Sequence, residues 1–136
     1  MEQRVSLITL AVADIARTRT FYVDGLGWTP LFVADDVLMF AVADRLILSL
    51  WSAEGFTAEI GESPAPGLAP LTLAHNLATP AEVDAVLAEA ASLGAAVSPA
   101  QEREWGGYSG YFSDPDGFRW EVAVNPGEIG DFVLPR

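Results

Sequence analysis

The sequence predicts an α+β fold made of two βαβββ modules within a single domain. An internal repeat supports this, because Ile8-Thr9-Leu10-Ala11 recurs as Leu71-Thr72-Leu73-Ala74, and each copy precedes a helical stretch that closes on Leu-Gly. Three short apolar runs then follow in each half. With 136 residues, 51% of them hydrophobic, the chain is long enough to bury a core. The expected boundaries are about 4–52 for module one, about 53–69 for a linker, about 70–125 for module two and 126–136 for a C-terminal tail.

In the first half, the pattern assigns each element in turn. Alternating and β-branched side chains predict a strand over residues 7–12. Asp14 can cap a helix that ends near Gly25, with an apolar stripe formed by Ile15, Thr18, Tyr22 and Leu26. Three apolar runs predict the remaining strands at residues 28–33, 37–42 and 46–51.

The second half repeats this order, beginning with a strand expected over residues 71–77. The segment Thr79-Pro80-Ala81-Glu82 is a capping box with proline at the first helical position, and Gly94 can supply the left-handed residue that ends the helix. Strands are expected at about residues 97–102, 107–113 and 118–124. The last two are joined by Asp114-Pro115-Asp116-Gly117, whose proline and glycine suit a tight turn.

Composition excludes several classes of function. The chain has seven arginines, no lysine and 19 acidic residues, a net charge of −12 that repels phosphate backbones, so we expect no nucleic-acid partner. It lacks cysteine, which removes disulfides and thiolate chemistry. The start Met-Glu-Gln-Arg-Val is unlike a secretory leader, and no apolar stretch approaches the ~20 residues that span a bilayer. We expect a cytoplasmic protein with no membrane partner.

Several segments resemble the glyoxalase/bleomycin-resistance/extradiol-dioxygenase superfamily, also called vicinal oxygen chelate. The matching residues are Ile8 to Asp14, Phe21-Tyr22, Leu26-Gly27 and Gly110 to Glu121, and the Asp-Pro-Asp-Gly turn before an aromatic residue and a glutamate is the most specific of them. The likeness covers residues 4 to about 125. It implies two curled mixed sheets around a cavity, helices on the convex side and a homodimer.

Within that fold, strand alternation assigns side chains to the two sides of each sheet. The side chains expected on the helix side are Ile8, Leu10, Val12, Leu71, Leu73, Leu77, Phe118, Trp120 and Val122. Those expected on the cavity side are Leu7, Thr9, Ala11, Thr72, Ala74, Asn76, Arg119, Glu121 and Ala123. The cavity set is small and polar, which suits a binding pocket.

Metal-dependent members of the superfamily hold a divalent ion with His and Glu side chains from the first, fourth, fifth and last strands. In this chain those positions hold Leu7, Leu48 or Ser49, Thr72 and Glu121, and only Glu121 is a usual metal ligand. His75, the single histidine, shares the parity of Leu73 and is expected on the helix side. We therefore expect no catalytic metal and no other cofactor. The alternative is an improvised divalent-metal site with His75, Glu121 and a third group.

The candidate ligand-binding residues are Thr9, Trp51, Thr72, Asn76, Trp105, Tyr108, Arg119 and Glu121. Glu121 is also the candidate catalytic residue, as a general base or an anchor for a ligand, unless Arg119 neutralises it in an ion pair. Trp51, Trp105 and Tyr108 offer flat surface for a ligand or, alternatively, pack within the fold.

Three functional hypotheses follow. The first is a metal-free pocket that binds or sequesters a small organic molecule, as the resemblance to bleomycin-resistance proteins implies, with the acidic charge favouring a cationic ligand. The second is a metal-free lyase, isomerase or similar enzyme that uses Glu121 as acid and base. The third is a metal-dependent lyase, isomerase or dioxygenase with rearranged ligands. A purely structural or regulatory domain is also possible.

Overall fold

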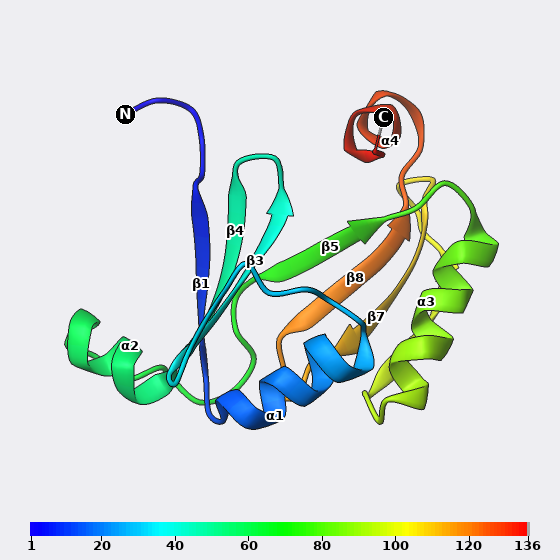
Figure 1. Cartoon of the computed structure of the whole chain (residues 1–136). Coiled ribbons are helices and arrows are strands. Elements are labelled where there is room, and N and C mark those ends of the chain that lie inside the picture. Colours follow the sequence, from blue (N-terminus) through cyan, green and yellow to red (C-terminus); the bar gives the residue numbers. More distant parts are fainter. Residues whose placement is uncertain (136) are drawn as a thin grey trace. The chain divides into compact units, whose positions relative to one another are not determined.

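The computed structural model describes residues 1–135 (Figure 1). The chain divides into two compact units, and the boundary in the sequence lies between Gly67 and Leu68. Each unit contains one four-stranded mixed sheet together with helices. The predicted α+β fold with two βαβββ modules is therefore confirmed. Among residues 1–135, no helix has the length and apolar character that a membrane span requires.

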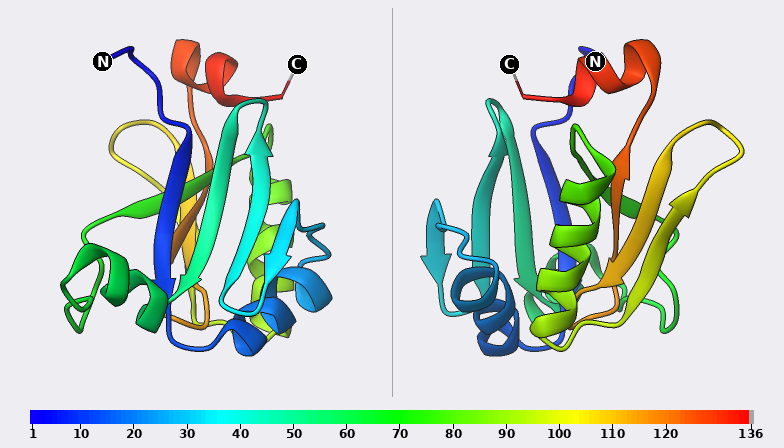
Figure 2. Two further views of the ribbon diagram at one scale, coloured as in Figure 1. Left: turned by 60° about the vertical axis from the view of Figure 1, so that its left-hand side comes forward. Right: turned by 90° about the vertical axis from the view of Figure 1, so that its right-hand side faces the viewer.

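The sheet of the first unit has the strand order β1-β4-β3-β2 (Figure 2, left). Its strands are β1 (Leu7–Val12), β2 (Phe32–Ala34), β3 (Val37–Ala43) and β4 (Leu46–Ser52). β1 runs parallel to β4, whereas β4–β3 and β3–β2 are antiparallel pairs. A parallel pair needs a crossover connection, and the helix after β1 begins that connection.

That helix differs from the continuous α-helix predicted. After α1 (Ile15–Arg19), which Asp14 caps at 2.9 Å from the Ala16 amide, the chain widens into the π-helix η1 (Thr20–Gly25). The wider turn allows the consecutive residues Phe21 and Tyr22 both to be buried. In a regular α-helix, consecutive side chains point about 100° apart, so the apolar stripe alone does not predict this turn.

Trp28 also departs from its predicted place. A strand was expected over residues 28–33, but β2 forms only over Phe32–Ala34. The Trp28 ring instead packs 5.2 Å from Tyr22 and 5.3 Å from Phe40 between ring centroids. Trp28 therefore belongs to an aromatic cluster with Tyr22 and Phe40, and the strand begins only at Phe32.

The expected linker over residues 53–69, in which the sequence allowed a short helical turn, begins with the helix α2 (Ala53–Ile60). The Ser52 hydroxyl accepts a hydrogen bond of 3.1 Å from the Gly55 amide, and Gly61 ends the helix with φ of 87°. The expected tail likewise contains a helix, α4 (Gly127–Val133). A Cβ on Gly130 would lie 2.0 Å from the Asn125 carbonyl oxygen, so only glycine fits at this position of α4, where the helix packs against the backbone before it.

The sheet of the second unit has the order β5-β8-β7-β6. Its strands are β5 (Thr72–Asn76), β6 (Val97–Glu102), β7 (Tyr108–Ser113) and β8 (Arg119–Val124). Helix α3 (Pro80–Ser92) covers one side of this sheet (Figure 2). The predicted capping box is confirmed, since the Thr79 and Glu82 side chains each bond the other's backbone amide. The predicted left-handed Gly94 is confirmed as well, with φ of 86°.

Burial agrees with most of the predicted helix-side residues. The apolar residues buried in the first unit are Leu10, Val12, Phe21, Tyr22, Val37, Leu38, Phe40, Leu48 and Leu50, and those in the second are Val83, Leu87, Ala90, Phe112, Trp120, Val122 and Ala123. Leu71 is a correction. Because β5 is an edge strand that begins at Thr72, Leu71 lies outside the sheet and stays 38% exposed.

Candidate functional site

The candidate site lies on the far side of the second sheet, the side away from α3. The register of β5, β8 and β7 aligns Ala74 with Glu121 and Glu121 with Tyr111. Side chains aligned across strands share one side of a sheet. The adjacent rows carry Thr72, Arg119 and Ser113 on one flank and Asn76, Ala123 and Ser109 on the other. We call the polar side chains of these rows, together with Arg103, the polar face: Thr72, Asn76, Arg103, Ser109, Tyr111, Ser113, Arg119 and Glu121.

Glu121 interacts with the hydroxyl of Tyr111, its neighbour across the strands. Burial is the main cause that raises the pKa of Tyr111 above 10.0, followed by the negative charge of Glu121 and a hydrogen bond to it, while the positive charge of Arg103 lowers it. Tyr111 is therefore neutral at physiological pH, with its hydroxyl able to donate to the half-buried carboxylate.

Arg119 does not neutralise Glu121. Its Nη1 donates to the Ser113 hydroxyl at 2.5 Å and to the Gly117 carbonyl oxygen at 2.9 Å. No ion pair joins Arg119 to Glu121 in the part of the chain that the structure describes. The alternative of a structural Arg119–Glu121 pair is thus not what the fold adopts, and among residues 1–135 no ion pair joins the Glu121 carboxylate to a cation.

Arg103 is fixed at the opposite flank of the polar face. Its Nε donates to the Ser109 hydroxyl and its Nη2 to the Ser109 carbonyl oxygen, both at 2.9 Å. Its guanidinium carbon lies 5.8 Å from the centroid of the Tyr111 ring, a distance suited to a cation–π contact. Arg103 therefore holds Tyr111 from one side while Glu121 interacts with its hydroxyl.

Thr72 and Asn76 lie on the polar face as predicted from strand parity, but they differ in availability. Thr72 is exposed and aligned with Arg119. Asn76 is half-buried and already bonded, because its side-chain oxygen accepts a hydrogen bond from the Asn125 amide. Thr72 is the more accessible of the two.

Trp105 and Tyr108 are not part of the polar face. Tyr108 pairs with Glu102 and Val124, and its hydroxyl donates to Asp84 of α3 at 2.8 Å, which places it on the helix side. Trp105 lies in the loop before β7, 49% exposed, and its ring occupies the space beside Gly107, where a Cβ would lie 1.7 Å from the ring. These placements favour the packing interpretation for Tyr108 and leave Trp105 as a surface aromatic.

Thr9 and Trp51 belong to the first unit, on the side of its sheet away from α1. Thr9 is exposed and aligned with Ser49. Trp51 is half-buried: its Nε1 donates to Asp36 at 3.0 Å, and its ring lies 6.4 Å from that of Phe56 in α2. Trp51 thus has packing partners within its own unit.

Comparison with known proteins identifies the superfamily of this chain. The model of the Glyoxalase/Bleomycin resistance protein/Dioxygenase superfamily matches residues 4–122. The chain belongs to this superfamily.

Solved structures of the superfamily support the assignment. A glyoxalase-related enzyme from Fulvimarina pelagi is 30% identical with a TM-score of 0.84, over 92% of this chain and 90% of that one. A glyoxalase/bleomycin resistance protein/dioxygenase from Nocardioides is 23% identical with a TM-score of 0.78, over 94% and 90%. A lactoylglutathione lyase from Agrobacterium tumefaciens is 22% identical with a TM-score of 0.71, over 90% and 93%. The last two show likeness of fold alone, and no curated protein matches the chain.

The positions that the resemblance equates with metal ligands can now be assigned to side chains. On the fourth strand, Ser49 is aligned with Thr9 away from α1, whereas Leu48 is buried on the helix side. The four positions are therefore Leu7 and Ser49 in the first unit and Thr72 and Glu121 in the second, and of these side chains only the Glu121 carboxylate is a usual ligand of a divalent ion.

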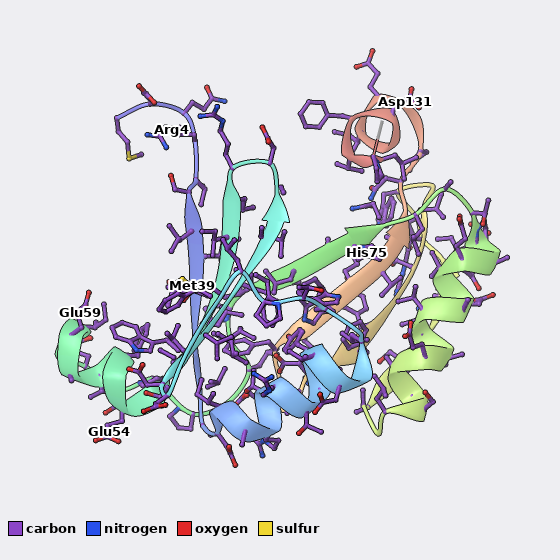
Figure 3. The ribbon with its side chains drawn as sticks, viewed as in Figure 1. Arg4, Met39, Glu54, Glu59, His75 and Asp131 are labelled. Carbon is purple, nitrogen blue, oxygen red and sulfur yellow. The ribbon has the colours of Figure 1, made fainter. Side chains whose placement is uncertain are left out.

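His75 does not improve this donor set within the sheet. It is aligned with the buried Val122, on the helix side, whereas Glu121 is aligned with Ala74 (Figure 3 labels His75 on β5). Within either unit, residues 1–135 contain no group of three His, Asp or Glu side chains placed to hold a metal.

Sequence reasoning missed Tyr111, Arg103, Ser109 and Ser113. The register of Tyr111 could have been found, because the tight turn at residues 114–117 fixes how β7 and β8 align and so sets Tyr111 opposite Glu121. Arg103 gave no comparable signal. Its position depends on an irregularity in β6 between Ser98 and Gln101 and on the loop that follows.

Proposed function

We propose that this superfamily member binds a small organic ligand at the polar face without a metal ion, with Glu121 as the acceptor that anchors it. The observation that supports this most is the state of Glu121. It is half-buried, it interacts with the neutral hydroxyl of Tyr111, and Arg119 on the same strand is bonded elsewhere. A half-buried carboxylate that Arg119 does not neutralise can accept a donor group from a ligand.

The chemistry of the Tyr111–Glu121 pair fits an anchor. An ionised carboxylate has about four acceptor sites, and the Tyr111 hydroxyl uses one of them. A hydrogen bond between the carboxylate and a ligand hydroxyl or amine would contribute about 1.5–3 kcal/mol, as bonds to charged groups do. That is enough to set the orientation of a small ligand.

The proposal is tested with a ligand panel read by thermal shift and calorimetry. The panel includes cationic glycopeptide drugs and small dicarbonyls, because a ligand that binds the native state raises its stability. We expect Glu121→Gln to weaken a hit by about tenfold or more, the equivalent of one charge-assisted bond. Glu89→Gln, which removes the same charge from exposed α3, is the matched control and should bind normally. Equal affinity in wild type and Glu121→Gln would refute the anchor.

An enzymatic role is the second candidate, and the Tyr111–Glu121 pair favours it. The pair places a carboxylate, which can accept a proton, beside a phenol hydroxyl, which can donate a hydrogen bond. The likeness to a protein described as a glyoxalase-related enzyme adds support. Turnover that disappears in Glu121→Gln while binding persists would establish this role. A stability gain with Zn²⁺, Mn²⁺ or Fe²⁺ would instead favour the metal-dependent alternative.

The homodimer and the cytoplasmic location remain proposals. In support of self-association, α4 carries apolar side chains that are exposed in the described chain: Ile129 at 65%, Phe132 at 83% and Val133 at 40%.

A further inference from the structure

The polar face carries a positive charge that contrasts with the rest of the protein. Between residues 68 and 135 the sequence contains only two arginines, Arg103 and Arg119, and both lie on this face. Glu121 is the single carboxylate among the residues of the face. In a chain of net charge −12, this one surface therefore carries two guanidinium groups and one carboxylate.

Both arginines are held in the same manner. Each donates to a serine hydroxyl and to a backbone carbonyl oxygen: Arg103 to both acceptors of Ser109, and Arg119 to Ser113 and Gly117. A guanidinium has five N–H donors. Arg103 uses its Nε and one terminal nitrogen, and Arg119 uses Nη1, so within residues 1–135 both keep N–H groups that no hydrogen bond occupies. Fixed guanidinium groups lose little entropy when they bind an anion.

The two arginines flank the Tyr111–Glu121 row. Ser109, Tyr111 and Ser113 alternate along β7 and share one side of the sheet. Successive same-side residues of a strand are roughly 7 Å apart. A molecule of about ten non-hydrogen atoms that donates to Glu121 can therefore reach a guanidinium on at least one flank.

We propose that the polar face selects a small organic carboxylate that also carries a hydroxyl or amine, with the donor group on Glu121 and the carboxylate on a guanidinium of Arg103 or Arg119. This proposal rests on the binding function above and defines its ligand class. Planar guanidinium groups match carboxylates in shape and charge. A simple cation could bind Glu121, but the same face also carries two positive charges that would disfavour it.

The net charge of the whole chain does not oppose this. Charges farther away than the Debye length, about 8 Å at physiological salt, are largely screened. The acidic residues of α3 lie on its exposed surface, on the other side of the sheet. Local charge on the polar face therefore decides which ligand groups bind there.

Three matched probes test the charge preference: mandelate, mandelamide and 2-amino-1-phenylethanol. All carry a phenyl ring and a hydroxyl, but the third group is an anion, a neutral amide or a cation. In ¹H–¹⁵N NMR titrations, we expect mandelate to bind at least fivefold tighter than the other two and to shift the Nε–H signals of Arg103 or Arg119. Equal binding of the three probes, or tighter binding of the amine, would overturn the ligand class.

Arginine variants test which side chain causes the preference for mandelate. Arg103→Gln and Arg119→Gln should each be tested, and at least one should abolish the advantage of mandelate. Arg45→Gln, at an exposed turn of the first unit, removes the same charge and should keep it. Arg103→Lys and Arg119→Lys retain the charge, so partial recovery in them separates anion binding from loss of folding.

The outcomes also separate the two proposals. Binding that depends on Glu121 but not on probe charge or on either arginine would refute the carboxylate class and leave the anchor standing. If neither the three probes nor the wider ligand panel binds, both proposals fail.

Discussion

The two units of this protein share one scaffold but carry different chemistry at equivalent positions. The internal repeat aligns Ala11 with Ala74. In the first unit, Ala11 is aligned across the strands with Trp51 and then Val37, and in the second unit Ala74 is aligned with Glu121 and then Tyr111. The position of the half-buried indole in one sheet is therefore the position of the carboxylate in the other.

The difference extends over the whole of these sheet sides. Away from α1, the first sheet carries mainly apolar side chains: Leu7, Thr9, Ala11, Phe32, Val37, Met39, Ala41, Ile47, Ser49 and Trp51 (Figure 3 labels Met39 on β3). The polar face holds the matching place in the second sheet. The helix sides, in contrast, hold most of the buried apolar residues in both units. The repeated scaffold thus depends on the helix sides, and the other sides are free to diverge.

The largest expected effect tests whether the helix sides are equivalent. Leu50→Ala in the first unit and Leu87→Ala in the second remove side chains that are 0% and 4% exposed. We expect each to lower the free energy of unfolding by about 2–5 kcal/mol, the range for buried leucines. Urea denaturation measures both. A cost under 1 kcal/mol at either site would show that the two helix sides do not contribute alike.

A smaller effect distinguishes Trp51 from Glu121. Trp51→Ala should cost about 2–3 kcal/mol, because a half-buried indole leaves Phe56 and Asp36 without their partner. Glu121→Ala should change stability by less than about 1 kcal/mol, since it breaks no ion pair. Trp51→Phe, which loses only the bond to Asp36, serves as the control at about 0.5–1 kcal/mol. If Glu121→Ala proves the costlier change, Glu121 is structural and not a binding group.

The smallest effect concerns the titration of Tyr111. Burial and Glu121 raise its pKa, and Arg103 lowers it. Glu121→Gln should therefore decrease the pKa of Tyr111, and Arg103→Gln should increase it. NMR of ¹³Cζ-labelled tyrosine follows the titration, with Tyr108 as an internal reference whose pKa is raised chiefly by its hydrogen bond to Asp84. Shifts of the same sign in both variants would contradict the geometry of the polar face.

The raised pKa of Tyr111 also predicts how the stability of the protein depends on pH. A raised pKa means that the folded state favours the neutral phenol, so this stabilisation is complete below the pKa of the unfolded chain, near 10, and is lost as pH rises through the folded value. Glu121→Gln should weaken this alkaline loss.

Most elements of the fold could be predicted because their determinants are local. Alternation gave β1 at its observed bounds, the strand expected at about residues 97–102 agrees with β6, and the capping box gave the start of α3 at Pro80. The π-helix after Arg19 and the short β2 could not be predicted in this way. Both lie beside the contacts of Tyr22 and Trp28 with Phe40, which join residues distant in sequence.

The candidate site was predicted in part. Strand parity put Thr72, Asn76, Arg119 and Glu121 on one side of the second sheet. It could not show that Arg119 bonds to Ser113 and Gly117 and forms no ion pair with Glu121. The aromatic side chain of Tyr108 predicted either a ligand contact or packing within the fold, and its hydroxyl bonds to Asp84 of α3.

The sequence by itself determined the repeated scaffold, because periodicity, capping and turn chemistry act over a few residues. The partners of Glu121 were decided only by the tertiary structure. Tyr111 comes from a neighbouring strand, and Arg103 reaches the face from beyond an irregular strand, so both depend on pairing register. Side-chain hydrogen bonds of that kind form only after the strands have paired, and no local pattern records them.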